Sequence, residues 1–345
     1  MKQKKSKKDM TLKERFVEGF KEFVSAYIIV FFIRLFLIEA FQIPSQSMVP
    51  NLLVKDILMV EKLTMGTKIP ILNWKVPGFL KPKRNDIIVF ISPAWESPGF
   101  SKELISLLTF SIINLDNTFE TPKNLVKRLV AEPGDRIAMS NQILFINGKK
   151  VETESIGISK QPIIERFKYA GDAPFHLYEE SYNGKKRIIQ YFAPYEKRED
   201  LEYQNTIKKL NENSLLESFD FYREYLQSNF PEIYVPKKGD VIKIQELNPY
   251  NRYLIKLLIE REIKKKIKVS DGRLLLDGKE ITEWEIKENY YFGMGDNRNL
   301  SEDCRYFGFI PESNIFGKPF VRYWPLLRVG FDFNEKKKSI IKKYL

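Results

Sequence analysis

A long apolar stretch near the N-terminus is the strongest hydrophobic feature of the chain. Phe23–Ile33 is predominantly apolar, but it is shorter than the roughly 17–25 residues that a membrane-spanning helix needs. Continuing through Leu35–Ile38 reaches that length and takes in Arg34, whose charge costs about 2.5–3.5 kcal/mol at the bilayer centre. We therefore predict one membrane span near residues 21–38, with Arg34 near its far end. A buried core helix is the alternative.

The charges that flank this stretch predict its orientation. The lysine-rich N-terminus, MKQKKSKK, should stay in the cytoplasm, which places the rest of the chain on the outer face of the cytoplasmic membrane. The stretch also resembles a secretory signal peptide, but IEAFQIP offers no small-residue cleavage site, so we expect an uncleaved anchor. A later apolar stretch at 104–115 is too short to span and is interpreted as a helix or an interfacial patch.

From Leu53 onward, apolar and polar positions follow a β-rich pattern. KPKRNDIIVFIS (81–92) predicts a turn and a strand, and LVKRLV (125–130) predicts a strand that ends at the Pro133–Gly134 turn. Two hairpins are predicted from Asn147–Gly148 within 142–151 and from Asp277–Gly278 within 273–281. The segments around these hairpins resemble each other, which is explained better by shared turn chemistry than by an ancient duplication.

These patterns predict a mostly β fold: an antiparallel, barrel-like catalytic domain with one N-terminal transmembrane helix and a mixed α/β insertion. The stretch 152–235 is charged and rich in Tyr and Glu, with helix-like parts. The predicted segments are a basic cytoplasmic N-terminus (1–20), the anchor (21–38), the first part of the catalytic domain (39–151), an insertion or second domain (152–270), the closing part (271–333) and a basic tail (334–345).

The formal net charge of +12 raises the question of nucleic-acid binding, which the distribution of the lysines argues against. They crowd the N-terminus, the segment 254–268 and the C-terminal tail, with no recognisable nucleic-acid motif among them. Basic residues beside an apolar stretch fit an anionic bilayer surface better. We expect no nucleic-acid partner.

Histidine and cysteine are too scarce for two common kinds of site. The chain has one of each, His176 and Cys304, so a zinc site built from these residues is not expected, and a Ser–His–Asp triad could use only His176. His176 lies in a polar context typical of a surface position. A hydrolase in this chain would work without a histidine base, and no metal or other cofactor is expected.

Three segments carry the candidate chemistry: FQIPSQSMVPNL (41–52), LVKRLVAEPGD (125–135) and GMGDNRNLSEDCRYFGFIP (293–311). Each alone has an ordinary explanation as a turn, a strand with an exposed lysine or an Asx-rich loop. In this order, behind an N-terminal anchor, they resemble the type I signal peptidases, which are membrane-anchored Ser–Lys endopeptidases. The resemblance runs from RLFLIEAFQIPSQSM to the third segment but leaves out about 152–235.

The residues support this chemistry independently of the family. A serine hydroxyl needs an adjacent base to act as a nucleophile, and burial of a lysine favours the neutral amine that can serve. In the strand LVKRLV, Lys127 shares a face with Leu125 and Leu129, which is the apolar setting that such a lysine needs. Arg128 points the other way and is interpreted as structural.

The resemblance assigns roles to individual residues. It implies Ser47 as nucleophile, Lys127 as general base, Ser45 as an oxyanion-hole hydroxyl beside the Ser47 backbone N–H, and Ser301 as the hydroxyl that orients the lysine. Asp303 and Arg305 match a structural pair, for which an ordinary surface ion pair is the alternative. The residues that match substrate-pocket positions, or are simply core, are Phe41, Ile43, Met48, Leu52 and Val126.

The resemblance also implies the partners: exported preproteins, cut after small residues in an Ala-x-Ala-like pattern, the lipid bilayer and, as a further candidate, the translocation machinery. The sequence departs from the family pattern at Asn85, Glu132, Asn299, Leu300 and Cys304. Lys256 is a weaker rival to Lys127, and a buried structural thiol is the better interpretation of Cys304. A catalytically silent membrane-anchored binding protein and a self-cleaving repressor are the competing classes.

Overall fold

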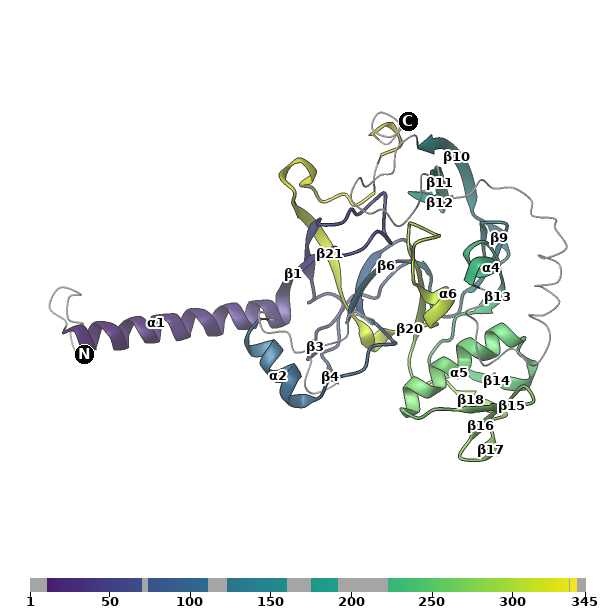
Figure 1. The fold of residues 1–345 in the computed structure, drawn as a ribbon, viewed down its shortest axis with the longest axis horizontal. Helices are drawn as coiled ribbons and strands as arrows, with labels where there is room; N and C mark the ends of the chain where they lie inside the picture. Colours follow the sequence, from purple (N-terminus) through teal and green to yellow (C-terminus); the bar gives the residue numbers. More distant parts are fainter. Residues whose placement is uncertain are drawn as a thin grey trace.

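The computed structural model describes residues 11–69, 74–110, 123–159, 175–191, 223–334 and 336–339. A mostly β body carries one long helix that projects away from it (Figure 1). The predicted mostly β architecture is confirmed.

The central element is an antiparallel sheet curled into a half-barrel (Figure 1). Its strands are, in spatial order, β1 (Ile38–Gln42), β2 (Ile57–Glu61), β21 (Ile315–Trp324), β5 (Ile87–Ile91), β6 (Asn124–Ala131), β19 (Tyr290–Met294) and β20 (Ile310–Pro311). Both predicted strands, in 81–92 and 125–130, are present as β5 and β6, which pair with Ile88 opposite Lys127. The sheet therefore joins strands from three parts of the chain that are far apart in sequence: β1 and β2, β5 and β6, and β19 to β21.

Smaller sheets surround the half-barrel. They are β13 (Phe230–Tyr234) with β7 (Arg136–Ser140), β8 (Ile143–Ile146) and β9 (Lys149–Lys150); β10 (Glu152–Ser159) with β11 (Phe175–Tyr182) and β12 (Lys185–Tyr191); β14 (Val241–Lys243) with β18 (Glu283–Glu285); β15 (Lys268–Ser270) with β16 (Arg273–Leu276) and β17 (Lys279–Glu280); and β3 (Lys68–Ile69) with β4 (Trp74–Lys75).

Both predicted hairpins are confirmed. Asn147–Gly148 and Asp277–Gly278 have positive φ and connect β8 to β9 and β16 to β17, as type I′ turns require. LIKLLI, which loosely resembles LVKRLV, lies instead within a helix, α5 (Pro249–Ile263). Asn248 caps this helix by accepting from Asn251 N at 2.9 Å.

Apart from α5 and the N-terminal helix, the helices are short. They are α2 (Phe100–Leu108), α4 (Arg223–Ser228), α6 (Cys304–Phe307) and the 3₁₀ turns Ile244–Glu246, Glu312–Asn314 and Leu326–Arg328. The helix predicted within 104–115 is present as α2, but 111–115 lies outside the described residues. Most of the helix-like stretch before Arg223 also lies outside them.

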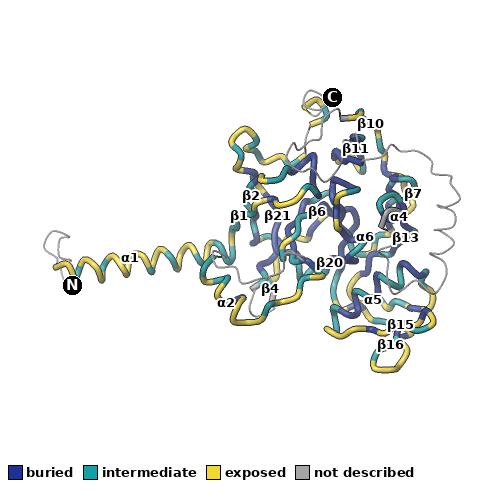
Figure 2. Tube along the Cα trace, in the orientation of Figure 1, coloured by how far each residue is buried: buried dark blue, intermediate teal, exposed yellow. Residues whose placement is uncertain are grey.

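The N-terminal helix, α1 (Leu12–Phe32), continues as a π-helical turn over Ile33–Leu37 and ends where β1 begins. Thr11 and Glu14 form a capping box at its start. Most of its length is exposed (Figure 2), and the exposed residues include the apolar Phe23 and Ile29. Among the helices of the described residues, none combines the length and the apolar character that crossing a membrane requires. The predicted span at 21–38 is therefore not confirmed.

Two of the four hydrophobic clusters among the described residues make up most of the core. The larger packs strands β5, β6 and β19 against β7, β8, β13 and α5, with Leu129, Phe292 and Ile259 fully buried. The smaller lies between β1, β2, β5 and the chain segment between β1 and β2. Leu129, two residues after Lys127 on β6, belongs to the larger cluster, and Met48, next to Ser47, belongs to the smaller.

Candidate active site

Ser47 lies in the tight loop between β1 and β2, and its side chain is 7% exposed. The loop is fastened to the third motif by Asn297, whose backbone N–H donates to Ser47 O at 3.0 Å. The Asn297 side chain also donates to Gln46 O at 3.2 Å. The serine segment and the third motif, about 250 residues apart in sequence, thus form one structural unit.

Lys127 reaches this serine from the middle of β6. Its Nζ donates to Ser47 Oγ at 2.8 Å, and its side chain is 3% exposed. Leu129 is fully buried and Leu125 packs against the same cluster, so the lysine lies on the apolar face that strand alternation predicts. The neighbouring Arg128 instead forms a bidentate ion pair with Asp296, with Nε–Oδ1 at 2.8 Å and Nη2–Oδ2 at 2.7 Å.

Burial sets the protonation of the lysine. Desolvation lowers the pKa of Lys127 from its ordinary value to about 8, although the nearby Asp303 carboxylate opposes this shift. A neutral amine is then accessible near neutral pH, because removing a charge from a buried group is favourable. When the amine is neutral, the same 2.8 Å contact can be made with the Ser47 hydroxyl as donor and the amine as acceptor, so the amine is placed to take that proton.

The two further serines take different positions. Ser45 Oγ donates to Ser47 Oγ at 3.4 Å and is exposed. Ser301 is 4% exposed, and its hydroxyl has no hydrogen-bond partner among the described residues. A Cβ added at Gly295 would overlap Ser301 Oγ and Ser47 O. Ser301 is thus brought beside the serine loop, but without a hydrogen bond to Lys127.

Asp303 and Arg305 form a fully buried pair. Arg305 Nε donates to Asp303 Oδ1 and Nη2 donates to Oδ2, both at 2.9 Å, while Gly295 N donates to Oδ2 at 2.9 Å. Burial alone would raise the pKa of Asp303, but Arg305 holds it below its ordinary value. The pair is therefore a buried support of the third motif and not the surface ion pair that was the alternative.

Cys304 is fully buried, and burial raises the pKa of its thiol above its ordinary value. Gly293 N donates to its sulfur at 3.1 Å. A protonated, inaccessible thiol is unreactive, which agrees with the structural interpretation.

The five expected pocket residues belong to one hydrophobic cluster. Ile43, Met48 and Leu52 are buried, and Phe41 and Val126 pack against them as partly buried residues. Met48 follows Ser47 directly in the loop, whereas Val126, next to Lys127 on β6, points to the opposite face of the strand from the lysine.

The rival bases lie elsewhere in the fold. Lys256 is on α5, where its amine pairs with Glu260 at 3.0 Å, one turn further along the helix. His176 lies on β11 opposite Tyr191. Within the described ranges, no group of His, Cys, Asp and Glu side chains is arranged to hold a metal ion.

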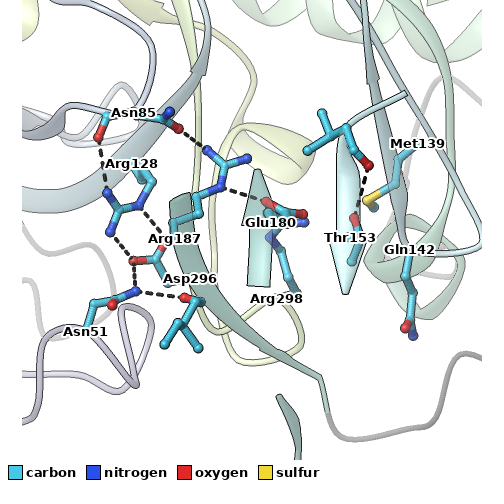
Figure 3. A network of polar contacts seen from close by, with 12 residues as sticks. Asn51, Asn85, Arg128, Met139, Gln142, Thr153, Glu180, Arg187, Asp296 and Arg298 are labelled. Atoms are coloured by element: carbon cyan, nitrogen blue, oxygen red, sulfur yellow. Dashed lines mark hydrogen bonds and ion pairs between the residues drawn. The ribbon is translucent and has the colours of Figure 1, made fainter. Parts of the chain in front are cut away.

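A polar network that the sequence does not predict lies beside the site (Figure 3). Asp296 accepts from Arg128 and also from Asn51 Nδ2 at 2.7 Å, so it joins β6 to the serine loop. Asn51 donates as well to Ile188 O on β12 at 2.8 Å. Asn51 and Asp296 lie in the first and third of the segments that carry the candidate chemistry. Their hydrogen-bond partners lie on strands that are distant in sequence, so the sequence alone does not predict these bonds.

A buried lysine bonded to a serine hydroxyl, set in a β fold, is the arrangement of a serine hydrolase that lacks a histidine base. The family model "Signal peptidase, peptidase S26" matches residues 16–324. The chain therefore belongs to the signal peptidase family, peptidase S26, and within it to the type I signal peptidases, which are serine peptidases that process signal peptides.

Curated relatives agree with this assignment. The chain is 29% identical to the signal peptidase I of Buchnera aphidicola subsp. Baizongia pistaciae, covering 88% of this chain and 74% of that protein. It is 27% identical to the signal peptidase I of Aquifex aeolicus, covering 88% and 84%. A crystal structure of a signal peptidase I from Enterococcus faecalis is 17% identical and covers 69% of this chain and 97% of that one, with a TM-score of 0.25, too low to add to the assignment.

Proposed function

We propose that the chain cleaves signal peptides from exported preproteins after an Ala-x-Ala-like site, with Ser47 as nucleophile and Lys127 as general base. The observation that carries this proposal is the 2.8 Å hydrogen bond between a buried lysine amine and a serine hydroxyl.

The reaction follows from this geometry. The neutral Lys127 amine takes the Ser47 proton as Oγ attacks the scissile carbonyl, and the Ser47 N–H and the Ser45 hydroxyl stabilise the developing oxyanion. The protonated amine then donates to the leaving amine, which releases one product and leaves an acyl-enzyme. Water, activated by the same amine, attacks the ester and regenerates Ser47.

In this proposal, specificity for small residues comes from the steric exclusion of larger substrate side chains. The substrate side chains one and three residues before the cleaved bond would meet the cluster of Phe41, Ile43, Met48, Leu52 and Val126. An apolar pocket with little free depth excludes larger side chains, so discrimination comes from clashes and not from polar recognition.

The proposed setting is the outer face of the cytoplasmic membrane, with residues 21–38 as anchor and the basic N-terminus inside. The exposed apolar side chains of α1 support contact with lipid. Ser47 follows β1, which begins directly after the π-helical turn, so the site stands close to the bilayer, where a preprotein leaves the translocation machinery. The segments 39–151 and 271–333, which hold all the proposed site residues, are the proposed catalytic parts.

The test is cleavage of a preprotein with an Ala-x-Ala site by the full chain in lipid vesicles, with the products identified by mass. We expect wild type to cut after the second alanine and Ser47→Ala to be inactive while folded. Cleavage at another position would contradict the specificity, and activity of Ser47→Ala would contradict the nucleophile.

A further inference from the structure

The insertion contributes a hairpin, β11–β12, that touches the active-site loops directly. We infer that this hairpin is a positioning element for the reaction, with Glu180, Arg187 and Asn85 as positioning residues that hold the Ser47 loop through the third motif. The inference rests on the proposed function of Ser47.

The main chain of β12 holds the segment that fastens Ser47. Gln190 N donates to Asp296 O at 3.0 Å, and Arg298 N donates to Gln190 O at 3.1 Å. These bonds hold the residues on both sides of Asn297, which itself donates to Ser47 O. Because each peptide unit is planar, fixing both neighbours fixes the direction of the Asn297 N–H.

The hairpin also holds the serine loop at a second point. Asn51, four residues after Ser47, is fully buried and donates its side-chain N–H groups to Ile188 O on β12 and to Asp296. The serine loop is therefore held at two points, the Ser47 carbonyl and the Asn51 side chain. Two points of attachment limit rotation of the loop as well as its translation.

A buried charge network keeps the hairpin in place (Figure 3). Glu180 on β11 stands opposite Arg187 on β12 and accepts from it at 2.6 Å. The same oxygen of Glu180 accepts from Arg298 of the third motif at 2.7 Å. Each of the three side chains is at most 3% exposed, and burial makes such hydrogen-bonded ion pairs geometrically strict.

Asn85 gives the network an anchor on the central sheet. Its φ is 73°, a left-handed conformation that favours glycine. Its side-chain oxygen accepts from Arg187 Nη1 at 2.7 Å, and its backbone carbonyl accepts from Arg128 at 3.1 Å. An asparagine at this strained position therefore carries a contact to the insertion that glycine would lack.

The test measures kcat and KM of full-length variants on the same preprotein. Asn85→Gly removes the acceptor of a buried Arg187 N–H, which lowers stability, and relieves the left-handed backbone, which raises it. Because these two effects oppose each other, the variant should stay folded. We expect kcat to fall about 10-fold, and about 100-fold for Glu180→Gln, because small displacements of a nucleophile are costly. KM should stay unchanged, since these residues do not face the substrate pocket.

Two further variants separate positioning from stability. Lys186→Ala removes an exposed pair with Glu179 on the same hairpin and should keep wild-type kcat. Arg187→Lys cannot serve both Glu180 and Asn85, so its kcat should fall, and adding Asn85→Gly should lower it no further.

The outcomes are distinct from those that test the proposed function. If Asn85→Gly and Arg187→Lys keep wild-type kcat, or lose activity only in proportion to the folded fraction measured by circular dichroism, the positioning role is overturned. The proposed function would still stand, provided that Ser47→Ala is inactive and wild type is active in the same assay.

Discussion

At the scale of single residues, the site depends on one lysine being uncharged. Lys127 is buried among apolar side chains and bonds to Ser47 Oγ. The strand alternation of LVKRLV predicts this apolar face correctly, because side-chain direction in a strand follows from sequence position alone. The network around Asp296 could not be predicted in the same way, because its partners come from different strands.

The pH dependence of activity follows from the lysine. Because burial lowers the pKa of Lys127 to about 8, the amine is protonated below that pH and cannot act as a base. We expect kcat/KM for preprotein cleavage to fall about tenfold per pH unit below this pKa and to level off above it. A profile that is flat from acidic to mildly alkaline pH would contradict the assignment of the base.

Ser301→Ala separates orientation from stability. The Ser301 hydroxyl is buried without a partner among the described residues, so removing it should leave the free energy of unfolding unchanged or raise it by about 1 kcal/mol. If the hydroxyl orients Lys127 during the reaction, kcat should fall about 100-fold. Wild-type kcat in this variant would remove Ser301 from the site.

At the scale of elements, the site is assembled by loops that pack on one another. Gly295 lies between Ser301 and the Ser47 carbonyl, and the third motif holds the serine loop through Asn297. The two hairpins with Asn–Gly and Asp–Gly turns were predictable because turn chemistry is local. The docking of β11–β12 was not, because it depends on ion pairs between residues more than 100 positions apart.

Gly295→Ala tests this close packing. The added methyl group would overlap backbone and side-chain atoms of the two serines, so we expect a loss of about 1–3 kcal/mol in the free energy of unfolding and little residual cleavage. Gly330→Ala is the matched control, since a Cβ there meets nothing within 4 Å. Denaturant unfolding with equal midpoints for Gly295→Ala and wild type would refute the packing argument.

At the scale of the whole molecule, the proposed active-site serine follows β1, which comes directly after the N-terminal helix, and the proposed substrate would be presented at a membrane. The apolar pattern correctly predicts a helix before β1, but the helix begins at Leu12, earlier than the predicted span. The pattern reports hydrophobicity, whereas the helix start is determined by the Thr11–Glu14 capping box.

Membrane attachment through α1 is tested by placing charge on it. Phe23 and Ile29 are 66% and 59% exposed, and changing both to Glu should shift the protein from the vesicle pellet to the supernatant on sedimentation, because burying carboxylates in lipid is unfavourable. Val241→Glu, an exposed apolar position on β14, is the control and should stay bound. Equal binding of both variants would show that α1 is not the anchor.

The most direct test of the Ser47–Lys127 pair compares Lys127→Met with Lys256→Met in preprotein cleavage. We predict that Lys127→Met is inactive and yet more stable by about 1–3 kcal/mol near neutral pH, because methionine removes a buried charge. Lys256→Met should cleave as wild type does. A folded Lys127→Met variant that cleaves at the wild-type rate would contradict the Ser–Lys mechanism.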